Sequence, residues 1–263
     1  MYAALDPLES WKSVEARGSV TQEKTKALYL SDTYRFESST CVTSSAKDEK
    51  GKPYVTLDQT IFYPQGGGQP CDRGTMKDNG FVVEVIGVRK APGGEIRHYL
   101  APDRPALTAG SAVTCLLDAE RRVLHARHHT AGHLISNVVE KLDPSLKAVK
   151  CHAFPQESYV EFLAGTSATA PNATLLQARV SEVIAIGRET KVFDISAEDF
   201  ERSFYRLPYD IPGKGSLRVV QIGEYSPVPC GGTHLRNIAE IGSVTIGKTV
   251  VKKGIARVSY ALP

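Results

Sequence analysis

Near the C-terminal end of the chain, the stretch PCGGTHL places a cysteine and a histidine four positions apart, with two glycines between them. Thiolate and imidazole are typical ligands of zinc in proteins. The glycines have no Cβ, so the chain can turn tightly enough for Cys230 and His234 to reach one ion. Two other interpretations fit this stretch alone: a tight hairpin, or a nucleophilic dyad in which the histidine activates the thiol.

The stretch HHTAGH supplies a matching pair, because His129 and His133 stand at positions i and i+4. On a helix these imidazoles lie on one face about one turn apart, so both can bind the same ion. Together the two pairs form a His, His, Cys, His set, which predicts a tetrahedral Zn²⁺ site. Either pair alone is weak evidence for a metal site, but the joint occurrence of the two pairs favours a shared site. The dyad interpretation would leave the helix histidines without a role.

The same stretch argues against one class of enzyme and adds a polar neighbour. Thr130, Ala131 and Gly132 stand between the two histidines, so the helix lacks the glutamate that acts as general base in His-Glu-x-x-His peptidases. His128 points in another direction on a helix, and we expect it to make a polar contact rather than to bind the metal.

A run of glycines in YPQGGGQP is the second candidate site. Gly66, Gly67 and Gly68 give backbone that a ligand can approach closely, and Gln65 and Gln69 flank them with amides. The run is not a phosphate-binding P-loop, because no Lys-Ser or Lys-Thr follows it. A long hairpin turn explains the composition equally well.

The elements that must hold the histidines and the cysteine follow from the hydrophobic pattern. Residues 118–144 carry apolar side chains at helical spacing, with Asp118 as the N-cap and Pro144 at the end. Two strands around a turn are predicted over 150–163, and two further helices begin after Asn172 and Ser196. Strands follow to the C-terminus, which indicates an α+β domain.

The N-terminal half is predicted to be β-rich. From residue 26 to about residue 113, short alternating runs are separated by turn signals, among them Asn79-Gly80 and Gly93-Gly94. We expect a small barrel or sandwich. The predicted organisation is an N-terminal extension over 1–24, a β-barrel domain with the glycine-rich motif over 25–115, and a zinc-binding α+β domain over 116–263.

The composition indicates an ordinary globular protein. The 263 residues are 41% hydrophobic and 23% charged, and the net charge of +3 permits a polyanionic partner without demanding one. Five widely spaced cysteines indicate reduced thiols in a cytoplasmic protein rather than a disulfide framework. No apolar run is long enough to span a membrane, and the N-terminus lacks the apolar region of a secretory signal. We expect a monomer with no membrane partner.

Three stretches, TIFYPQGGGQPCDRG, HHTAGHL and PCGGTHLRN, resemble in this order the editing domain of alanyl-tRNA synthetase. They resemble more closely its free-standing relatives, the AlaX-type alanyl-tRNA editing proteins. The likeness runs from about Thr25 to Ala261 and includes the tail EIGSVTIGKTVVKKGIARVSY. It implies an N-terminal β-barrel followed by an α+β editing domain of the alanyl- and threonyl-tRNA synthetase type. No adenylation domain is seen, so the resemblance implies editing in trans.

The resemblance assigns zinc to the four residues already singled out: His129, His133, Cys230 and His234. It also implies that the glycine-rich segment lies beside the place where the aminoacyl end of tRNA enters. The chain departs from the synthetases at His128, where they often have a small polar residue. Cys151 and His152 lie in a stretch that resembles one wall of the pocket in the AlaX proteins, and we expect them to alter which amino acid fits.

The implied reaction is hydrolysis of the ester that joins a wrong amino acid to tRNA(Ala), with serine and glycine as the expected errors. We expect Thr60, Gln69 and His152 to contact the hydroxyl of serine, and His128 and His152 to transfer protons. Three protein ligands plus water would make a zinc-activated nucleophile, whereas four protein ligands make a closed site. The sequence leaves this choice open.

Binding of the tRNA acceptor end requires basic side chains. The candidates for phosphate contacts are Arg121, Arg127, Lys252 and Lys253, although each run of charges is more often a solvated surface. Two alternatives belong to other classes of protein. One is an editing-like fold that binds zinc and RNA without catalysis, and the other is a zinc hydrolase of a different ester.

Overall fold

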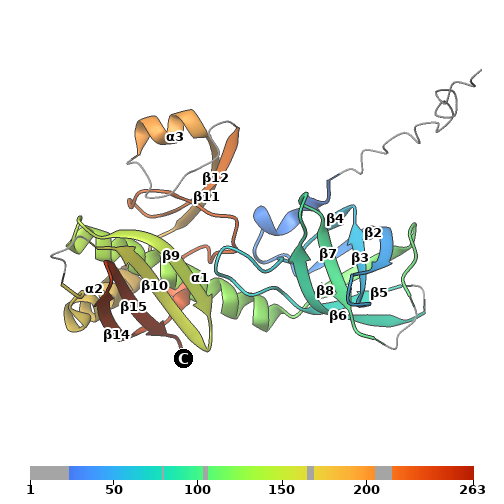
Figure 1. Ribbon diagram of the computed structural model, residues 1–263, viewed down its shortest axis with the longest axis horizontal. Coiled ribbons are helices and arrows are strands. Elements are labelled where there is room, and N and C mark those ends of the chain that lie inside the picture. The colour runs from blue at the N-terminus through green and yellow to red at the C-terminus, as the bar shows by residue number, and fades with distance from the viewer. Residues whose placement is uncertain (1–23, 79, 103–105, 165–168, 205–214) are drawn as a thin grey trace, which may run out of the picture.

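The computed structural model describes residues 24–78, 80–102, 106–164, 169–204 and 215–263. Figure 1 shows two lobes, a β-barrel near the N-terminus and a mixed α+β lobe that ends at the C-terminus. One long helix, α1 (Ala119–Leu142), joins them. The predicted fold class, a barrel followed by an α+β domain, is confirmed.

The barrel is closed and its strands follow the order β2-β3-β7-β6-β5-β8. Alternate side chains point inward along these strands and form one apolar core, as expected for a small barrel. A short parallel pair, β1 (Lys26–Ala27) with β4 (Gln59–Thr60), and the 3₁₀ helix η1 (Leu28–Leu30) pack beside it. The barrel strands are β2 (Glu37–Lys47), β3 (Pro53–Leu57), β5 (Gly74–Lys77), β6 (Val82–Lys90), β7 (Ile96–Leu100) and β8 (Ala112–Leu117).

Two predicted turns connect these strands. β5 and β6 pair antiparallel around the first, of which Asn79 lies outside the described residues. β6 and β7 pair around Gly93 and Gly94, whose φ values of 87° and 93° favour glycine. β8 runs to Leu117, which is two residues past the predicted domain boundary at 115.

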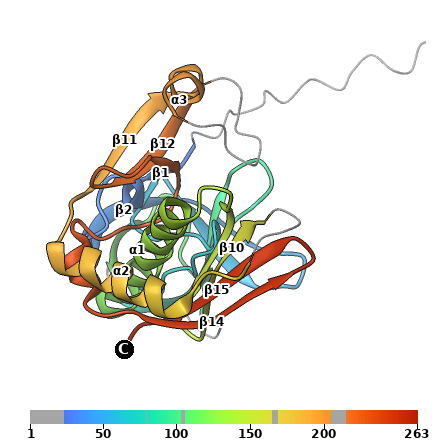
Figure 2. The ribbon, with the colours of Figure 1, turned by 90° about the vertical axis from the view of Figure 1, so that its left-hand side faces the viewer.

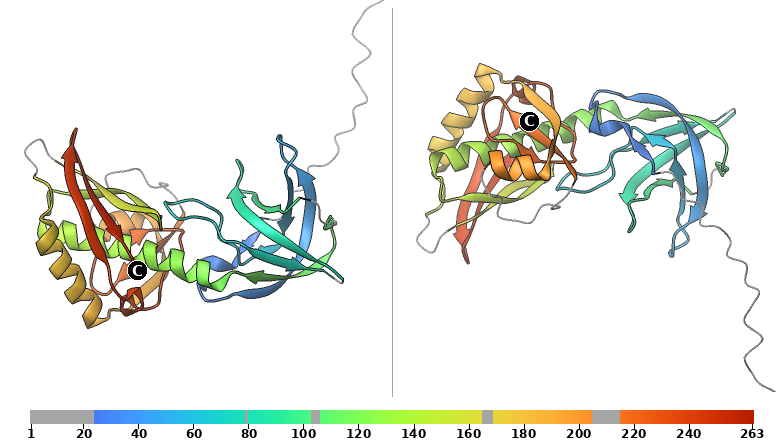
Figure 3. Two further views of the ribbon diagram at one scale, coloured as in Figure 1. Left: turned by 90° about the horizontal axis from the view of Figure 1, so that it is seen from below. Right: turned by 90° about the horizontal axis from the view of Figure 1, so that it is seen from above.

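Helix α1 starts at the barrel and crosses the second lobe from end to end (Figure 3). The Asp118 side chain accepts a hydrogen bond from the Arg121 backbone N–H and caps the helix as predicted. In the first turn, the fully buried Arg122 forms an ion pair with the buried Asp72 of the barrel domain. Arg122 Nη1 also donates to the Thr33 carbonyl at 2.9 Å. These contacts anchor the helix that carries His129 and His133 to the barrel.

The second lobe is built on an antiparallel sheet of order β14-β15-β10-β9. Helices α1 and α2 lie together on one side of this sheet (Figure 2), and their apolar faces complete a core with it. The Asn172 side chain caps α2 as predicted. The elements are β9 (Lys147–Phe154), β10 (Glu157–Leu163), α2 (Ala173–Ile186), β14 (Thr245–Lys252) and β15 (Ile255–Ala261).

A smaller sheet of order β11-β12-β13 carries helix α3 and has a core of its own. Its strands are β11 (Thr190–Ser196), β12 (Ser216–Ile222) and β13 (Val228–Pro229), and α3 covers Ala197–Ser203. The chain leaves β13 directly into the Cys-Gly-Gly-Thr-His stretch and then forms the 3₁₀ helix η2 (Ile238–Ile241). Among the described residues, no helix combines the length and apolar character needed to cross a membrane.

Candidate metal centre

The structure brings together the two residue pairs singled out in the sequence. His129 and His133 lie on α1, and Cys230 and His234 lie on the turn that follows β13. One nitrogen or sulfur atom from each of the four lies within 4.8 Å of the others. The three imidazoles are almost completely buried, and Cys230 is half-buried.

The distances between these atoms match those around a tetrahedral ion. Cys230 Sγ lies 3.3 Å from His234 Nε2 and 3.7 Å from His129 Nε2. A tetrahedral Zn²⁺ with ordinary bond lengths separates a sulfur from a nitrogen ligand by about 3.5 Å. The imidazole rings also crowd one another, with centroids 4.5 to 5.0 Å apart. The side chains therefore fit a shared metal ion.

Burial keeps these imidazoles neutral, which is the form that binds a metal. It lowers the pKa of His133 to about 4, and lowers the pKa values of His129 and His234 well below the ordinary value for histidine. Repulsion from neighbouring histidines and from Arg218 adds to this effect. Burial also raises the pKa of the Cys230 thiol, so binding of a metal must release its proton.

The amide of Gln69 fixes the orientation of His129. Gln69 is fully buried, and its Oε1 lies 2.7 Å from His129 Nδ1 and accepts the Thr233 backbone N–H at 3.0 Å. Its Nε2 donates to Thr233 Oγ1 at 2.8 Å. Because Oε1 can only accept, His129 carries its proton on Nδ1 and presents Nε2 to the centre. Gln69 thus joins the barrel domain to both halves of the cluster.

Thr130 does for His234 what Gln69 does for His129. Its hydroxyl lies 3.2 Å from His234 Nδ1 and accepts the Leu235 backbone N–H at 3.1 Å.

Gly232 is required in the cysteine turn, because a Cβ there would lie 2.1 Å from the His129 ring. The glycine in the turn therefore leaves room for a helix histidine, in addition to allowing the turn itself.

The glycine run forms a tight turn at the tip of a long hairpin. Gly66 and Gln69 exchange two backbone hydrogen bonds, and Gly67 and Gly68 between them have φ values of 51° and 77°. The Gly68 carbonyl accepts the Ala153 N–H at 2.7 Å, so the hairpin adds to the edge of β9. A Cβ on Gly68 would lie 1.9 Å from the Cys151 carbonyl oxygen. Gly68 is thus explained by close packing, whereas Gly66 and Gly67 are exposed.

The side chains of two residues expected to contact the substrate form hydrogen bonds within the protein instead. Thr60 is buried in the barrel domain, where its hydroxyl lies 2.8 Å from His98 Nε2 and accepts the Phe62 N–H. Gln69 is equally buried and its amide bonds His129 and Thr233, as described above. Both side chains are buried, so their placement does not support direct contact with the substrate.

The two other candidate catalytic histidines point away from the cluster. His128 Nδ1 lies within hydrogen-bond distance of Ser158 Oγ, at 2.9 Å, in the interface between α1 and the sheet, and burial lowers the pKa of His128 to about 4. The Cys151 side chain faces α1, so strand alternation places His152 on the opposite face of the sheet. There the His152 ring stacks on Phe154 and Tyr159. Neither placement supports proton transfer at the cluster.

The basic residues predicted to contact phosphate divide into two groups by the contacts of their side chains. Arg121 Nε donates to the Cys71 carbonyl, and Arg127 Nη2 donates to the Ile241 carbonyl, so both side chains hold neighbouring segments. Lys252 and Lys253 are exposed in the β14–β15 hairpin. The lysines are therefore the more accessible candidates for contacts with phosphate.

No sequence pattern pointed to Arg218, a cation that helps to shape the centre. Arg218 lies on β12, and its guanidinium donates to the carbonyls of Cys230 and Leu30. It thereby ties the cysteine turn to η1 beside the barrel. Thr130 and Thr233, in contrast, lie inside the two motifs. The sequence therefore showed that they are close to the histidines, but it did not show which hydrogen bonds they make.

Comparison with known proteins gives matches along most of the chain. The family described as tRNA synthetases class II (A) matches residues 13–121, and the threonyl and alanyl tRNA synthetase second additional domain matches residues 217–259. An alanyl-tRNA editing protein AlaX-M from Methanosarcina acetivorans is 32% identical over 246 residues, which cover 85% of this chain and 93% of the relative. The AlaX-M protein of Methanosarcina mazei is 31% identical, with 85% and 90% covered.

Alanine–tRNA ligases match as well. The ligase of Alkaliphilus oremlandii is 28% identical over 213 residues, which cover 80% of this chain but 24% of the ligase. The chain therefore corresponds to about a quarter of that enzyme, and to nearly the whole length of the AlaX-M proteins.

Proposed function

The chain belongs to the family of AlaX-M alanyl-tRNA editing proteins, and from this premise we propose that it hydrolyses mischarged aminoacyl-tRNA(Ala) in trans. The bond broken is the ester between the amino acid and the terminal ribose, and water supplies the hydroxyl group of the released acid. Serine is the preferred amino acid and glycine a second one. The apolar pocket in which a synthetase activates its amino acid discriminates only about a hundredfold against an analogue with an added hydroxyl, so a second selection step is useful.

We propose that the ion is Zn²⁺, held by His129, His133, Cys230 and His234. The observation that carries this proposal is the spacing of Cys230 Sγ from the two imidazole nitrogens, 3.3 and 3.7 Å, in a buried and neutral donor set. One thiolate and three imidazoles are a donor set that suits zinc. When bound, the ion would polarise the ester or a water molecule if one ligand position opens, and would otherwise organise the pocket.

The chain's own residues prepare this site before any metal binds. Gln69 and Thr130 orient two of the imidazoles, and Arg218 holds the carbonyl of the cysteine turn. The backbone of Gly66 and Gly67 is proposed to receive the terminal adenosine, because both glycines are exposed and the Tyr63 hydroxyl is the side-chain group that contacts them. Contributions from both lobes meet here, which supports the barrel domain over about 25–115 and the α+β domain over about 116–263 as one functional unit.

Deacylation assays with Ser-tRNA(Ala), Gly-tRNA(Ala) and Ala-tRNA(Ala) test this proposal. We expect the serine ester, and to a smaller extent the glycine ester, to be hydrolysed much faster than the alanine ester. Equal rates for all three would favour an esterase of broad specificity. Rates no higher than in buffer, with metal bound, would favour an RNA-binding protein without catalysis.

The metal is tested on the same preparations. Cys230→Ser removes the thiolate, so we expect the bound zinc to fall from one equivalent toward zero and the activity to fall with it. Cys41→Ser is the matched control, because Cys41 lies on β2 in the barrel and outside the cluster. A Cys230→Ser protein that keeps its full zinc content would contradict the assignment of this ligand.

A further inference from the structure

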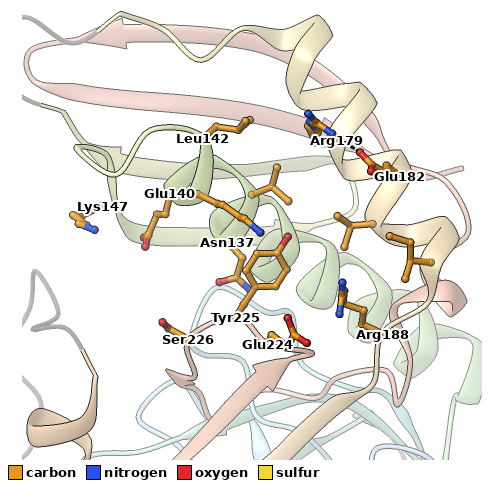
Figure 4. Close-up of a pocket in the computed structure, with 14 residues that line it drawn as sticks. Asn137, Glu140, Leu142, Lys147, Arg179, Glu182, Arg188, Glu224, Tyr225 and Ser226 are labelled. Carbon is orange, nitrogen blue, oxygen red and sulfur yellow. Dashed lines mark hydrogen bonds and ion pairs between the residues drawn. The ribbon is translucent and has the colours of Figure 1, made fainter.

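A second site candidate lies along α1, beyond the metal centre. An open cavity of about 790 Å³ is lined by the C-terminal half of α1, the end of α2 and the turn after β12. Figure 4 shows Tyr225 projecting from that turn toward α1, with Arg188 on the side of α2. Asn137 and Lys141 line the cavity from α1, one and two helical turns after His133.

The cavity is lined by four cations, Lys141, Lys147, Arg179 and Arg188, and by three carboxylates, Glu140, Glu182 and Glu224, so it carries one excess positive charge. Arg179 and Glu182 neutralise each other at 2.7 Å, and Glu140 accepts the Ala148 backbone N–H at 2.8 Å. Among the described residues, no carboxylate lies within ion-pair distance of Lys141 or Arg188. Lys141 and Arg188 therefore line one cavity from different elements, and neither forms an ion pair with its carboxylates.

Lys141 lies beside the Tyr225 ring, and Arg188 lines the same cavity from the end of α2. Lys141 Nζ lies 5.8 Å from the ring centroid. The stem of Arg188 packs closely on Gly223, because a Cβ on that glycine would lie 2.6 Å from Arg188 Cδ. The Tyr225 side chain is half-buried, and burial raises the pKa of its hydroxyl while the charge of Arg188 opposes this shift. A cavity that combines an aromatic ring with two cations that form no ion pair suits a ligand that carries both a phosphate and a flat base.

We propose that this cavity binds one nucleotide of the single-stranded 3′ end of the tRNA substrate, with its phosphate between Lys141 and Arg188 and its nucleoside against Tyr225. This inference rests on the proposed function. The eight residues from His133 to Lys141 span about 12 Å of helix, which corresponds to three or four stacked nucleotides. With the terminal adenosine at the metal centre, the cavity receives a nucleotide a few positions earlier in the strand.

The alternative occupant is an apolar protein segment, because Val138, Val183 and Ile186 also line the cavity. The double variant Lys141→Met/Arg188→Met separates the two occupants. It keeps the aliphatic stems and removes both charges, so it weakens a phosphate contact and strengthens an apolar one. Lys77→Met/Lys90→Met is the matched control, since it removes two exposed lysine charges from the barrel.

The probe is uncharged tRNA(Ala), with binding measured by fluorescence anisotropy over a series of KCl concentrations. For Lys141→Met/Arg188→Met we expect the Kd to rise about tenfold, and the slope of log K against log salt to decrease by about 0.7 to 1.4, for one or two phosphates. Zinc content and melting temperature stay at the wild-type values, and kcat at saturating tRNA changes much less than KM. The control changes neither the Kd nor the slope to this extent.

Affinity and slope equal to those of the control would overturn the inference, and so would weaker binding with an unchanged slope. Tighter binding by Lys141→Met/Arg188→Met would indicate an apolar contact and would overturn it as well. The proposed function fails separately, when the wild-type protein hydrolyses none of the three esters. Because uncharged tRNA is the probe, the cavity is tested whether or not hydrolysis occurs.

Discussion

Replacing Gln69 with alanine tests how far the barrel domain controls the metal centre. The Gln69 amide makes three buried hydrogen bonds, to His129 Nδ1 at 2.7 Å, to Thr233 N at 3.0 Å and to Thr233 Oγ1 at 2.8 Å. Alanine leaves two buried donors, the His129 Nδ1–H and the Thr233 N–H, without an acceptor. Each such group costs about 1–3 kcal/mol, so we expect the metal-free protein to lose at least about 2 kcal/mol of stability.

The same change should weaken metal binding. Without the acceptor, the His129 ring is free to rotate or change tautomer, and loss of a partner that orients a ligand typically lowers metal affinity 10–100-fold. This corresponds to about 1.4–2.7 kcal/mol of binding free energy. Competition with a chromophoric zinc chelator measures the affinity, and thermal melting with and without zinc measures the stability.

Two variants sharpen the experiment. Gln69→Glu keeps an acceptor for His129 and Thr233, so we expect it to retain metal affinity, because the bound cation offsets the cost of the buried carboxylate. Gln65→Ala is the control, since Gln65 lies in the same hairpin but is exposed and contacts Arg89 instead. If Gln69→Ala bound zinc as tightly as wild type, the positioning role would be refuted. Equal weakening by the control would attribute the effect to the hairpin.

Three further predictions concern the scaffold. Gly68→Ala should lower the melting temperature, because its Cβ would lie 1.9 Å from a backbone oxygen and its φ is 77°, whereas Gly66→Ala meets no atom closer than 4.0 Å and should be neutral; similar melting temperatures would contradict the close packing. Arg122→Met should cost about 3–5 kcal/mol in urea unfolding by leaving Asp72 buried without its partner, and a loss below about 1 kcal/mol would disprove this. Burial lowers the pKa of His98 from 6.5 to about 4, so the unfolded chain takes up this proton first and stability falls as the pH drops below about 6.5. His98→Gln should therefore lose about 2 kcal/mol less than wild type between pH 7 and pH 5, and identical pH profiles would refute the assignment.

The sequence by itself determined the local elements and the family. Helical spacing and the Asp118 cap predicted α1, and turn signals predicted the barrel hairpins, because side-chain periodicity and turn chemistry act over a few residues. The His-x3-His and Cys-x3-His pairs identified the four candidate ligands for the same reason. Each pair is set by local backbone geometry, and their chemistry indicates that they share an ion. The predicted family and fold are confirmed.

Only the tertiary structure decided what the remaining polar residues do. Gln69 was expected at the substrate, but the packing of the two lobes turns it inward onto His129. Thr60 is buried against His98 of the barrel, and strand alternation puts His152 on the outer face of the sheet. Lys141 and Arg188 line one cavity although they are far apart in the sequence. Such contacts depend on how separate elements dock, and no local pattern of residues encodes that arrangement.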